Sequence, residues 1–456
     1  MNRIEKYFKT VNGVSHTTFN PNTPGCVRVH LIPPKKIKFR TPWIVILNGK
    51  DILPISSSWA ILLKEFIDEV NKFQGQSIPL EEVTLILERT VNNVKQIFEK
   101  TSIDILRDDL KEIINILIDI GEGKNPSVNT GFMRLKDYAK YMNAPHRMDL
   151  MISSMYKNNK WHCNQKCIHC YAGNQEYAIK EELTTDEWKK IIDKCKKARI
   201  PQITFTGGEP TLREDLVELI EYSKWFVTRL NTNGVLLTKD LCNKLYNASL
   251  DNIQITVYSH NEHIHNLLVG ASNFNKTIEG LKNAKEANLF VNINTPLCSL
   301  NKDYLNMVKF FHQEYGITYF TCSGLIVTGN AVNDNSQNTQ LSKEEITEVI
   351  KEVHEYVKEH DLNLSFTSPG WIEYRTLEQM KLDVPTCGAC LSNMAISPNG
   401  EVIPCQSWLS NDGLGNLLHK SWESIWTSKK CKKIKKKIVN THLLCPLTLK
   451  NKKEGK

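Results

Sequence analysis

The first part of the chain, residues 1–125, opens with short apolar runs. In the stretch TPWIVILNGKDILPI, residues 41–55, two such runs lie on either side of Asn48 and Gly49. An Asn-Gly pair between two apolar runs is typical of the tight turn of a β-hairpin. We therefore expect two antiparallel strands here.

Helical patterns follow the hairpin. Apolar residues recur every three or four positions over 56–70 and again over 102–121. We expect Ser57 or Ser58 to cap the first helix and Gly121 to end the second, with a glycine-rich linker after it. Strands followed by helices predict a small α+β domain in this part of the chain.

The pattern changes between residues 148 and 370, where short apolar strands alternate with amphipathic helices. This alternation predicts right-handed βαβ units and a parallel sheet, either doubly wound or bent into a barrel. In both arrangements active residues lie where strands end and loops begin. The expected strands are 149–156, 202–208, 226–234, 252–259, 289–297 and 317–324.

A third region, 386–446, forms a small separate domain in this interpretation, and a basic tail follows at 447–456. The length of 456 residues with 41% hydrophobic residues suffices for two or three buried cores. No apolar run approaches the roughly 18 residues that a membrane helix needs, and the N-terminus lacks the apolar core of a secretion signal. We expect a cytoplasmic protein that makes no contact with a membrane.

The net charge of +8 arises largely near the C-terminus, where lysines crowd residues 429–437 and 450–456. Such a run can meet nucleic acid or an acidic partner. A solvated helix face is the commoner outcome and the one we expect, so we predict no nucleic-acid partner.

The 13 cysteines include two clusters. A reducing cytoplasm disfavours disulfides, so clustered thiols indicate metal binding or catalysis. The first cluster, at spacing C-x3-C-x2-C, directly follows an expected strand, and two kinds of site fit it. One is zinc completed by a distant ligand, and the other is a four-iron cubane with one iron left without a protein ligand. Its members are Cys163, Cys167 and Cys170.

This first cluster, followed by an aromatic residue, resembles the cluster loop of the radical S-adenosylmethionine (radical SAM) superfamily. The resemblance implies a partial (β/α)6 TIM-like barrel whose three cysteines hold a catalytic [4Fe-4S] cluster. In that superfamily the open iron chelates S-adenosylmethionine. The stretches TGGEP, NTNG and IQITVYS resemble its later cofactor motifs at the ends of strands. Carried over by position, the expected cofactor contacts are His169, Tyr171, Gly207, Gly208, Glu209, Asn231, Thr232, Asn233, Thr256 and Ser259.

The second cluster consists of Cys387, Cys390 and Cys405, with the last two at spacing C-x9-G-x4-C. This spacing resembles the SPASM/Twitch extension of peptide-modifying members, which carries auxiliary iron–sulfur clusters. Only Cys431 and Cys445 follow, which favours a shortened region with one auxiliary [4Fe-4S] cluster, and Cys445 is a candidate fourth ligand. A zinc ribbon on the same cysteines is the alternative.

Members with both regions mostly modify ribosomally made peptides or proteins by thioether or carbon–carbon crosslinks, epimerisation or side-chain oxidation. The order of the N-terminal elements resembles the winged-helix domain with which such maturases hold a leader peptide. The resemblance thus implies reductive cleavage of S-adenosylmethionine to a 5′-deoxyadenosyl radical, a precursor peptide or protein as substrate, and flavodoxin or ferredoxin as electron donor. The rivals are a radical enzyme of tRNA modification or cofactor biosynthesis, and a non-catalytic iron–sulfur or zinc protein.

Overall fold

Two compact units, Met1–Ala144 and Pro145–Lys456, make up the chain in the computed structural model. The expected linker after Gly121 and the basic tail lie almost entirely outside the described residues. Among the helices that the structure describes, none combines the length and the apolar character of a membrane span. The structure describes residues 3–11, 13–20, 26–34, 37–38, 40–48, 51–73, 76, 78–121, 139–332, 339–410, 413–441 and 443–447.

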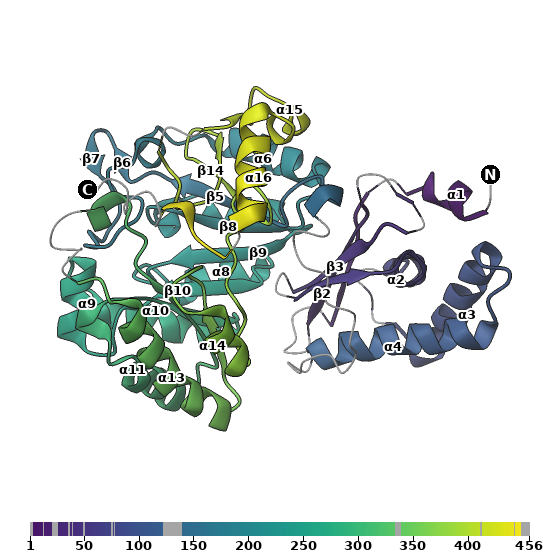
Figure 1. Ribbon diagram of the computed structural model, residues 1–456, viewed down its shortest axis with the longest axis horizontal. Helices are drawn as coiled ribbons and strands as arrows, with labels where there is room; N and C mark the ends of the chain where they lie inside the picture. The colour runs from purple at the N-terminus through teal and green to yellow at the C-terminus, as the bar shows by residue number, and fades with distance from the viewer. Residues whose placement is uncertain are drawn as a thin grey trace. The chain divides into compact units, whose positions relative to one another are not determined.

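The first unit contains a four-stranded antiparallel sheet in the order β1-β2-β3-β4 and helices that follow it in the chain (Figure 1). Strands β3 and β4 are the predicted hairpin, paired from Trp43 with Ile55 to Leu47 with Asp51. The elements are α1 (Arg3–Phe8), β1 (Ser15–Phe19), β2 (Val27–Ile32), β3 (Trp43–Leu47), β4 (Asp51–Ile55), α2 (Ser57–Asn71), α3 (Leu80–Ile97), α4 (Ile103–Gly121) and a 3-10 turn (Ala139–Tyr141).

The expected cap of helix α2 is corrected by one residue. Ser56, not Ser57 or Ser58, has the extended backbone of an N-cap and accepts a hydrogen bond from the Trp59 N–H. Ser57 is buried, and its hydroxyl donates to the Thr41 carbonyl at 3.2 Å instead. Helix α4 ends at Gly121 as predicted.

The second unit is built around seven parallel strands in the order β5-β8-β9-β10-β11-β12-β13, which is also their order in the chain (Figure 1). Helices connect successive strands, so the predicted partial barrel is confirmed, and β13 adds a strand that the sequence pattern missed. The strands are β5 (Arg147–Ser153), β8 (Gln202–Gly207), β9 (Val227–Thr232), β10 (Asn252–Thr256), β11 (Val291–Leu297), β12 (Tyr319–Gly324) and β13 (Asn363–Phe366). The helices are α6 (Thr185–Lys197), α7 (Leu216–Tyr222), α8 (Lys239–Asn247), α9 (Glu262–Val269), α10 (Phe274–Glu286), α11 (Tyr304–Tyr315), α13 (Lys343–Glu359) and α14 (Tyr374–Gln379).

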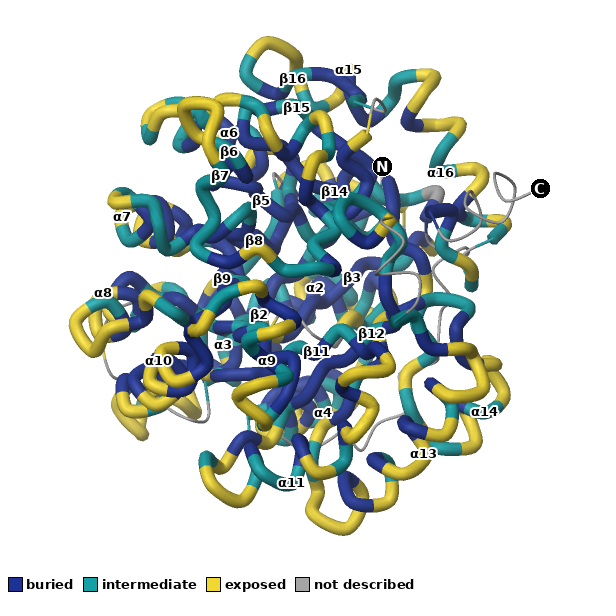
Figure 2. Tube along the Cα trace, turned by 90° about the vertical axis from the view of Figure 1, so that its left-hand side faces the viewer, coloured by how far each residue is buried: buried dark blue, intermediate teal, exposed yellow. Residues whose placement is uncertain are grey.

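Alternation along the strands separates an apolar side from a polar one. Ile253 and Ile255 on β10 are fully buried, whereas Gln254 between them is only half-buried. In Figure 2 the strands are mostly dark blue and teal, and the surrounding helices carry the exposed, yellow turns. The apolar side therefore packs under the helices, and the polar side faces into the barrel.

The C-terminal region extends the barrel sheet beyond β5. Strand β14 (Asn393–Ile396) pairs in parallel with β5, and β15 (Glu401–Ile403) returns antiparallel to β14. Gly400 follows Asn399 and adopts a positive φ of 86° in the turn between them, which is typical of an Asn-Gly turn. The remaining elements are β6 (Tyr156–Lys157), β7 (Lys160–Trp161), β16 (Gly415–Asn416), α15 (Trp422–Trp426), α16 (Lys429–Thr441) and 3-10 turns at Glu176–Ile179, Pro210–Leu212, Ser299–Asn301 and Gly329–Val332.

Candidate functional site

The three clustered cysteines lie in a loop that follows β5 and the short β6–β7 hairpin, here called the cysteine loop (residues 162–173). Its backbone is held by helix α9, because the N–H groups of Lys166 and Ile168 donate to the carbonyls of Val269 and Leu268 at 2.9 and 3.0 Å. The loop thereby lies at the C-terminal ends of the parallel strands, where active residues of barrels gather.

A second clamp comes from the segment after β12, which the sequence patterns did not indicate. The Asn330 N–H donates to the Cys170 carbonyl at 2.9 Å, and its side-chain Nδ2 donates to the Cys167 carbonyl at 3.2 Å. Gly329 has a positive φ of 60°, and a side chain there would meet the Tyr171 and Cys170 carbonyls. Asn330 therefore fixes the backbone at each of the last two cysteines of the loop.

The thiols of the cysteine loop are close enough for their charges to interact, and Glu209 lies within the same range. Burial raises the pKa of Cys163 to about 12, with the Glu209 charge acting in the same direction. Burial also raises the pKa values of Cys167 and Cys170. Thiolates in this pocket need a bound cation to be stable, which is what an iron centre provides.

The glycine pair at the end of β8 permits a close backbone contact with the end of β5. Gly207 has a φ of 144°, and a side chain there would come within 2.3 Å of the Ser153 carbonyl oxygen. The Gly208 N–H donates to that same carbonyl at 2.8 Å. The two glycines thus bring Glu209 directly against the strand that leads to the cysteine loop.

Glu209 is 1% exposed and is held by four hydrogen bonds. Its Oε1 accepts from the Thr211 N–H and hydroxyl at 3.0 and 2.6 Å and from the Thr232 hydroxyl at 2.7 Å. Its Oε2 accepts from the Asn233 N–H at 2.8 Å. Burial raises the pKa of this carboxyl although the hydrogen bonds oppose the shift. Because a carboxylate offers about four acceptor positions, the contacts in the described part of the chain leave one open at Oε2.

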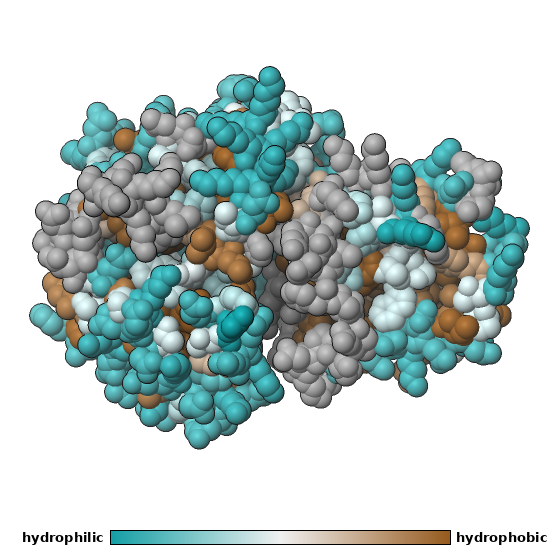
Figure 3. All heavy atoms as spheres, viewed as in Figure 1, coloured by the Kyte–Doolittle hydropathy of each residue, from teal (hydrophilic) through white to brown (hydrophobic). Residues whose placement is uncertain are grey.

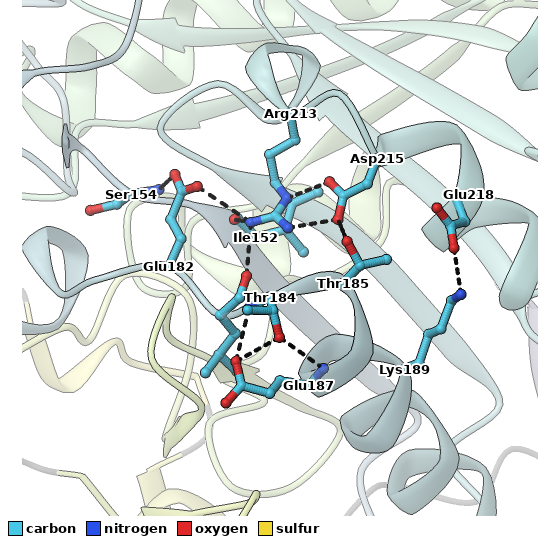
Figure 4. Close-up of polar contacts among 11 residues, drawn as sticks. Ile152, Ser154, Glu182, Thr184, Thr185, Glu187, Lys189, Arg213, Asp215 and Glu218 are labelled. Carbon is cyan, nitrogen blue, oxygen red and sulfur yellow. Dashed lines mark hydrogen bonds and ion pairs between the residues drawn. The ribbon is translucent and has the colours of Figure 1, made fainter.

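Arg213 connects this motif to the end of β5, as Figure 4 shows. Its guanidinium donates to both carboxylate oxygens of Asp215 at 2.8 and 2.7 Å, and to the Ile152 carbonyl at 3.0 Å. It also pairs with Glu182 at 3.3 Å, and Glu182 accepts from the Ser154 N–H at 2.8 Å. The bidentate pair of Arg213 with Asp215 has a fixed geometry. Arg213, which sequence analysis did not single out, therefore fixes the strand end that precedes the cysteine loop.

The expected cofactor residues on β9 and β10 differ in their surroundings. Thr232 and Asn233 contact Glu209, and the Asn233 side chain also donates to Asn164 of the cysteine loop at 2.6 Å. Ser259 is buried and accepts from the Asn261 N–H at 3.0 Å in a local turn. The structure thus brings Thr232 and Asn233 to Glu209, and Asn233 also to the cysteine loop. Asn231 and Thr256 are half-buried and lie at or near the ends of β9 and β10.

The side chains of His169 and Tyr171 are engaged by the protein itself. Nε2 of His169 lies 2.8 Å from the Thr339 hydroxyl, and burial lowers the pKa of this imidazole to about 4. The Tyr171 hydroxyl hydrogen-bonds the Thr206 side chain, and burial raises its pKa. His169 is therefore neutral at pH 7, and contacts of either residue with a cofactor stay a prediction.

Charged residues in the barrel interior were also missed. Arg229 on β9 interacts electrostatically with Arg147 and Asp149 on β5 and with Tyr319 on β12. Arg147 and Asp149 form an ion pair at 2.9 Å. Because β5, β9 and β12 are not neighbours in the sheet, these charged side chains interact across the interior, which is therefore polar rather than filled with branched apolar residues.

The second cysteine group gathers beside β14 and β15. Cys387, Cys405 and Cys445 interact electrostatically, and Cys390 interacts with Cys405. The side chains of Cys390 and Cys431 form a hydrogen bond. Cys431 was not among the expected ligands of this group, because a single cysteine within a run of lysines is typical of an isolated buried residue.

Two family models match this architecture. The radical SAM superfamily matches residues 162–311, and the iron–sulfur cluster-binding SPASM domain matches residues 357–446. The chain therefore carries a radical SAM domain followed by a SPASM domain. The resemblance read from the cysteine spacings is thereby confirmed for both regions. The chain is a radical SAM enzyme, with a SPASM domain after its barrel.

The relatives of this radical SAM enzyme are distant. PqqA peptide cyclase of Bradyrhizobium diazoefficiens is 28% identical over 257 residues, which is 55% of this chain and 66% of that protein. AdoMet-dependent heme synthase of Methanosarcina barkeri is 26% identical over 281 residues, 58% of this chain and 79% of that protein.

Solved structures share its fold over a longer stretch. SuiB of Streptococcus suis bound to S-adenosylmethionine has a TM-score of 0.60 at 15% identity, covering 93% of this chain and 95% of that one. SuiB bound to the precursor peptide SuiA gives 0.58 at 16% identity, covering 87% of each chain.

The cofactors of this enzyme are a catalytic [4Fe-4S] cluster, S-adenosylmethionine and an auxiliary iron–sulfur cluster. The side chains described above fit them. The three half-buried thiols of the cysteine loop would each ligate one iron of a cubane, and the open acceptor of Glu209 suits the ammonium of S-adenosylmethionine. In the described part of the chain, no three His, Cys, Asp or Glu side chains are placed to hold one single metal ion. A cubane does not require this, because each thiolate binds a separate iron.

Changing Glu209 to Gln tests its role in cofactor binding. The variant loses a charge-assisted hydrogen bond of about 1.5 to 3 kcal/mol, so we expect affinity for S-adenosylmethionine to fall about tenfold or more, with iron content unchanged. Isothermal titration calorimetry measures the affinity for S-adenosylmethionine. Thr211→Val, which removes one hydrogen bond to the same carboxylate but keeps its charge, should weaken binding less. Equal affinities of the parent and the Gln variant would refute the role.

Proposed function

We propose that this radical SAM enzyme modifies a ribosomally made peptide or protein, and that its first unit holds part of that substrate. The observation that carries the proposal is a separate N-terminal sheet whose β4 edge has no further strand in the described part of the chain. The match to SuiB supports it, because 87% coverage of this chain extends beyond the second unit, which holds about 68% of the residues. SuiB was solved with a precursor peptide, and PqqA peptide cyclase is named for a peptide.

The two edges of the N-terminal sheet differ. At the β1 edge, the Asn71 side chain from α2 donates to the His16 carbonyl at 2.9 Å. At the β4 edge, no further strand of the described chain pairs with β4, and Ile52 is 37% exposed. A main-chain edge of this kind accepts an extended peptide as an added strand. The β4 edge is therefore the docking edge in this proposal.

The barrel contributes the chemistry. When bound, the reduced [4Fe-4S] cluster and S-adenosylmethionine supply a 5′-deoxyadenosyl radical that abstracts a hydrogen atom from the substrate. Glu209 would orient the methionine ammonium, and Arg213 and Asn330 hold the backbone on which Glu209 and the cysteines depend. The polar interior around Arg229 and Asp149 would bind main-chain and polar groups of the peptide. A thioether or carbon–carbon crosslink, an epimerised centre or an oxidised side chain are the products consistent with this chemistry.

A proline at the docking edge provides a test. Pro54 on β4 lacks an N–H, so its nitrogen suits the side facing away from β3, and Ile52, two residues away, presents its N–H on that same side. Ile52→Pro should raise KM for the precursor about tenfold, because a main-chain donor to the peptide is lost, and leave peptide-free cleavage of S-adenosylmethionine unchanged. Ile52→Thr keeps the N–H and is the matched control. The same KM for Ile52→Pro and Ile52→Thr would contradict docking at this edge.

Cofactor biosynthesis is the second candidate, because heme synthases are among the relatives. Those matches cover 58% of this chain, which is a smaller share than the second unit alone, whereas the match to SuiB covers more than that unit. Incubation of the reconstituted enzyme with an iron porphyrin and S-adenosylmethionine distinguishes the two. Porphyrin turnover that does not require the first unit would favour the second candidate.

A further inference from the structure

Helix α16 carries an unusual density of positive charge. Its sequence, KKCKKIKKKIVNT, contains no acidic residue. Lysines three or four positions apart repel one another on a helix, so this pattern costs stability and calls for another explanation. In the described part of the chain, no carboxylate pairs with Lys432, Lys433, Lys436 or Lys437. The exposed lysines, here called the lysine face, are Lys429, Lys430, Lys432, Lys433, Lys436 and Lys437.

The opposite side of the same helix faces the second cysteine group. Cys431 is 0% exposed and hydrogen-bonds Cys390. Lys435, also turned inward, lies 3.1 Å from the ring centroid of the buried Trp426 and interacts electrostatically with both thiols. The lysine face in solvent is thus separated from the expected auxiliary ligands by one helix. Figure 3 shows strongly hydrophilic atoms over the position that α16 has in Figure 1.

Packed protein continues from this cysteine group to the cysteine loop. The Tyr171 side chain interacts electrostatically with both Cys170 and Cys405. Cys163, Cys170 and Tyr171 pack against a buried apolar cluster that includes Ala395 of β14 and Ile403 of β15. The Tyr171 side chain is therefore within electrostatic range of a thiol of each group.

We propose that the lysine face of α16 is the docking surface of an acidic one-electron carrier protein. In each encounter one electron leaves the reduced carrier and reduces the auxiliary cluster by one electron, with no atom or proton transferred. The proposal rests on the assignment of Cys387, Cys390 and Cys405 as ligands of that cluster. A positive face steers an acidic partner to the place where the path to the buried thiols is short. A nucleic acid could bind the same lysines, but its binding would not explain why the thiols lie directly behind them.

The test uses the full-length enzyme with both clusters reconstituted and a reduced, acidic flavodoxin as the probe. The variant combines Lys432→Gln, Lys433→Gln and Lys436→Gln. Anaerobic stopped-flow absorbance should show that flavodoxin reduces its auxiliary cluster at least about tenfold more slowly at low ionic strength, and with a weaker salt dependence. Reduction by dithionite, a small reductant that needs no docking surface, should be unchanged.

A control with the same loss of charge separates docking from net charge. It combines three exposed lysines on barrel helices, Lys197→Gln, Lys276→Gln and Lys358→Gln. Equal rates for the two triple variants would overturn the proposal, as would loss of tRNA binding in the α16 variant with an unchanged reduction rate. Iron analysis of the parent enzyme comes first, because auxiliary iron that is missing there would refute the cluster assignment rather than the docking surface.

Discussion

Replacing Cys163, Cys167 and Cys170 together with alanine is expected to abolish cleavage of S-adenosylmethionine. The three thiols lie in one loop and are expected to ligate three irons of one cubane, so iron should fall by about four per chain. Auxiliary iron should remain, because its expected ligands lie beside other strands, β14 and β15. Iron analysis and chromatographic detection of 5′-deoxyadenosine measure the two effects.

The control for this variant is another buried cysteine. Cys242 lies on α8, away from both cysteine groups, and is fully buried. Cys242→Ala should keep the iron content and the cleavage of the parent. Cofactor cleavage that persists in the triple variant would show that the catalytic cluster is held elsewhere.

Removing the first unit, residues 1–144, should separate binding of the peptide from the chemistry. The unit ends at Ala144, two residues after Met142, which packs against Ile44 and Ile46, and β5 begins at Arg147. The truncated enzyme should keep both clusters and cleave S-adenosylmethionine in the absence of peptide. Turnover of the full precursor should fall about a hundredfold or more, because the peptide is no longer held near the radical at high effective concentration.

Two other outcomes of the truncation have clear meanings. Unchanged turnover by a soluble truncated enzyme would show that the first unit does not recruit the peptide. Insoluble protein or lost clusters would indicate a structural cap instead, and the Ile52→Pro variant of the intact chain then decides between recruitment and cap.

The barrel was predictable because its signals are local. Alternation within each strand and helical spacing within each helix are visible over ten or fifteen residues, and the cysteine spacings lie within short loops. The N-cap of α2 was predicted wrongly because Ser56, Ser57 and Ser58 are three consecutive serines, and residue type alone does not distinguish them. Burial of Ser57 against Thr41 decides between them, and only the folded chain shows it.

The residues that support the site were missed because their contacts are long-range. Asn330 reaches the cysteine loop from 163 positions away, and Arg213 joins Ile152 from 61 positions away. Neither Asn330 nor Arg213 stands in a sequence motif that would indicate its distant partner. Cys431 was hidden in a lysine run, and only the packing of α16 brings it to Cys390. The division of the chain into 1–125, 148–370, 386–446 and 447–456 also stays a prediction, as do the individual ligand assignments.

Mass spectrometry of a candidate precursor peptide tests the central proposal most directly. The peptide is taken from a short reading frame beside the gene and incubated with the reduced enzyme and S-adenosylmethionine, with the triple cysteine variant as the control. Modification by this enzyme predicts 5′-deoxyadenosine together with a peptide that has lost about two mass units per crosslinked or desaturated site, or has unchanged mass and inverted stereochemistry. An unmodified peptide in the presence of full cofactor cleavage, with turnover of a porphyrin under the same conditions, would contradict it.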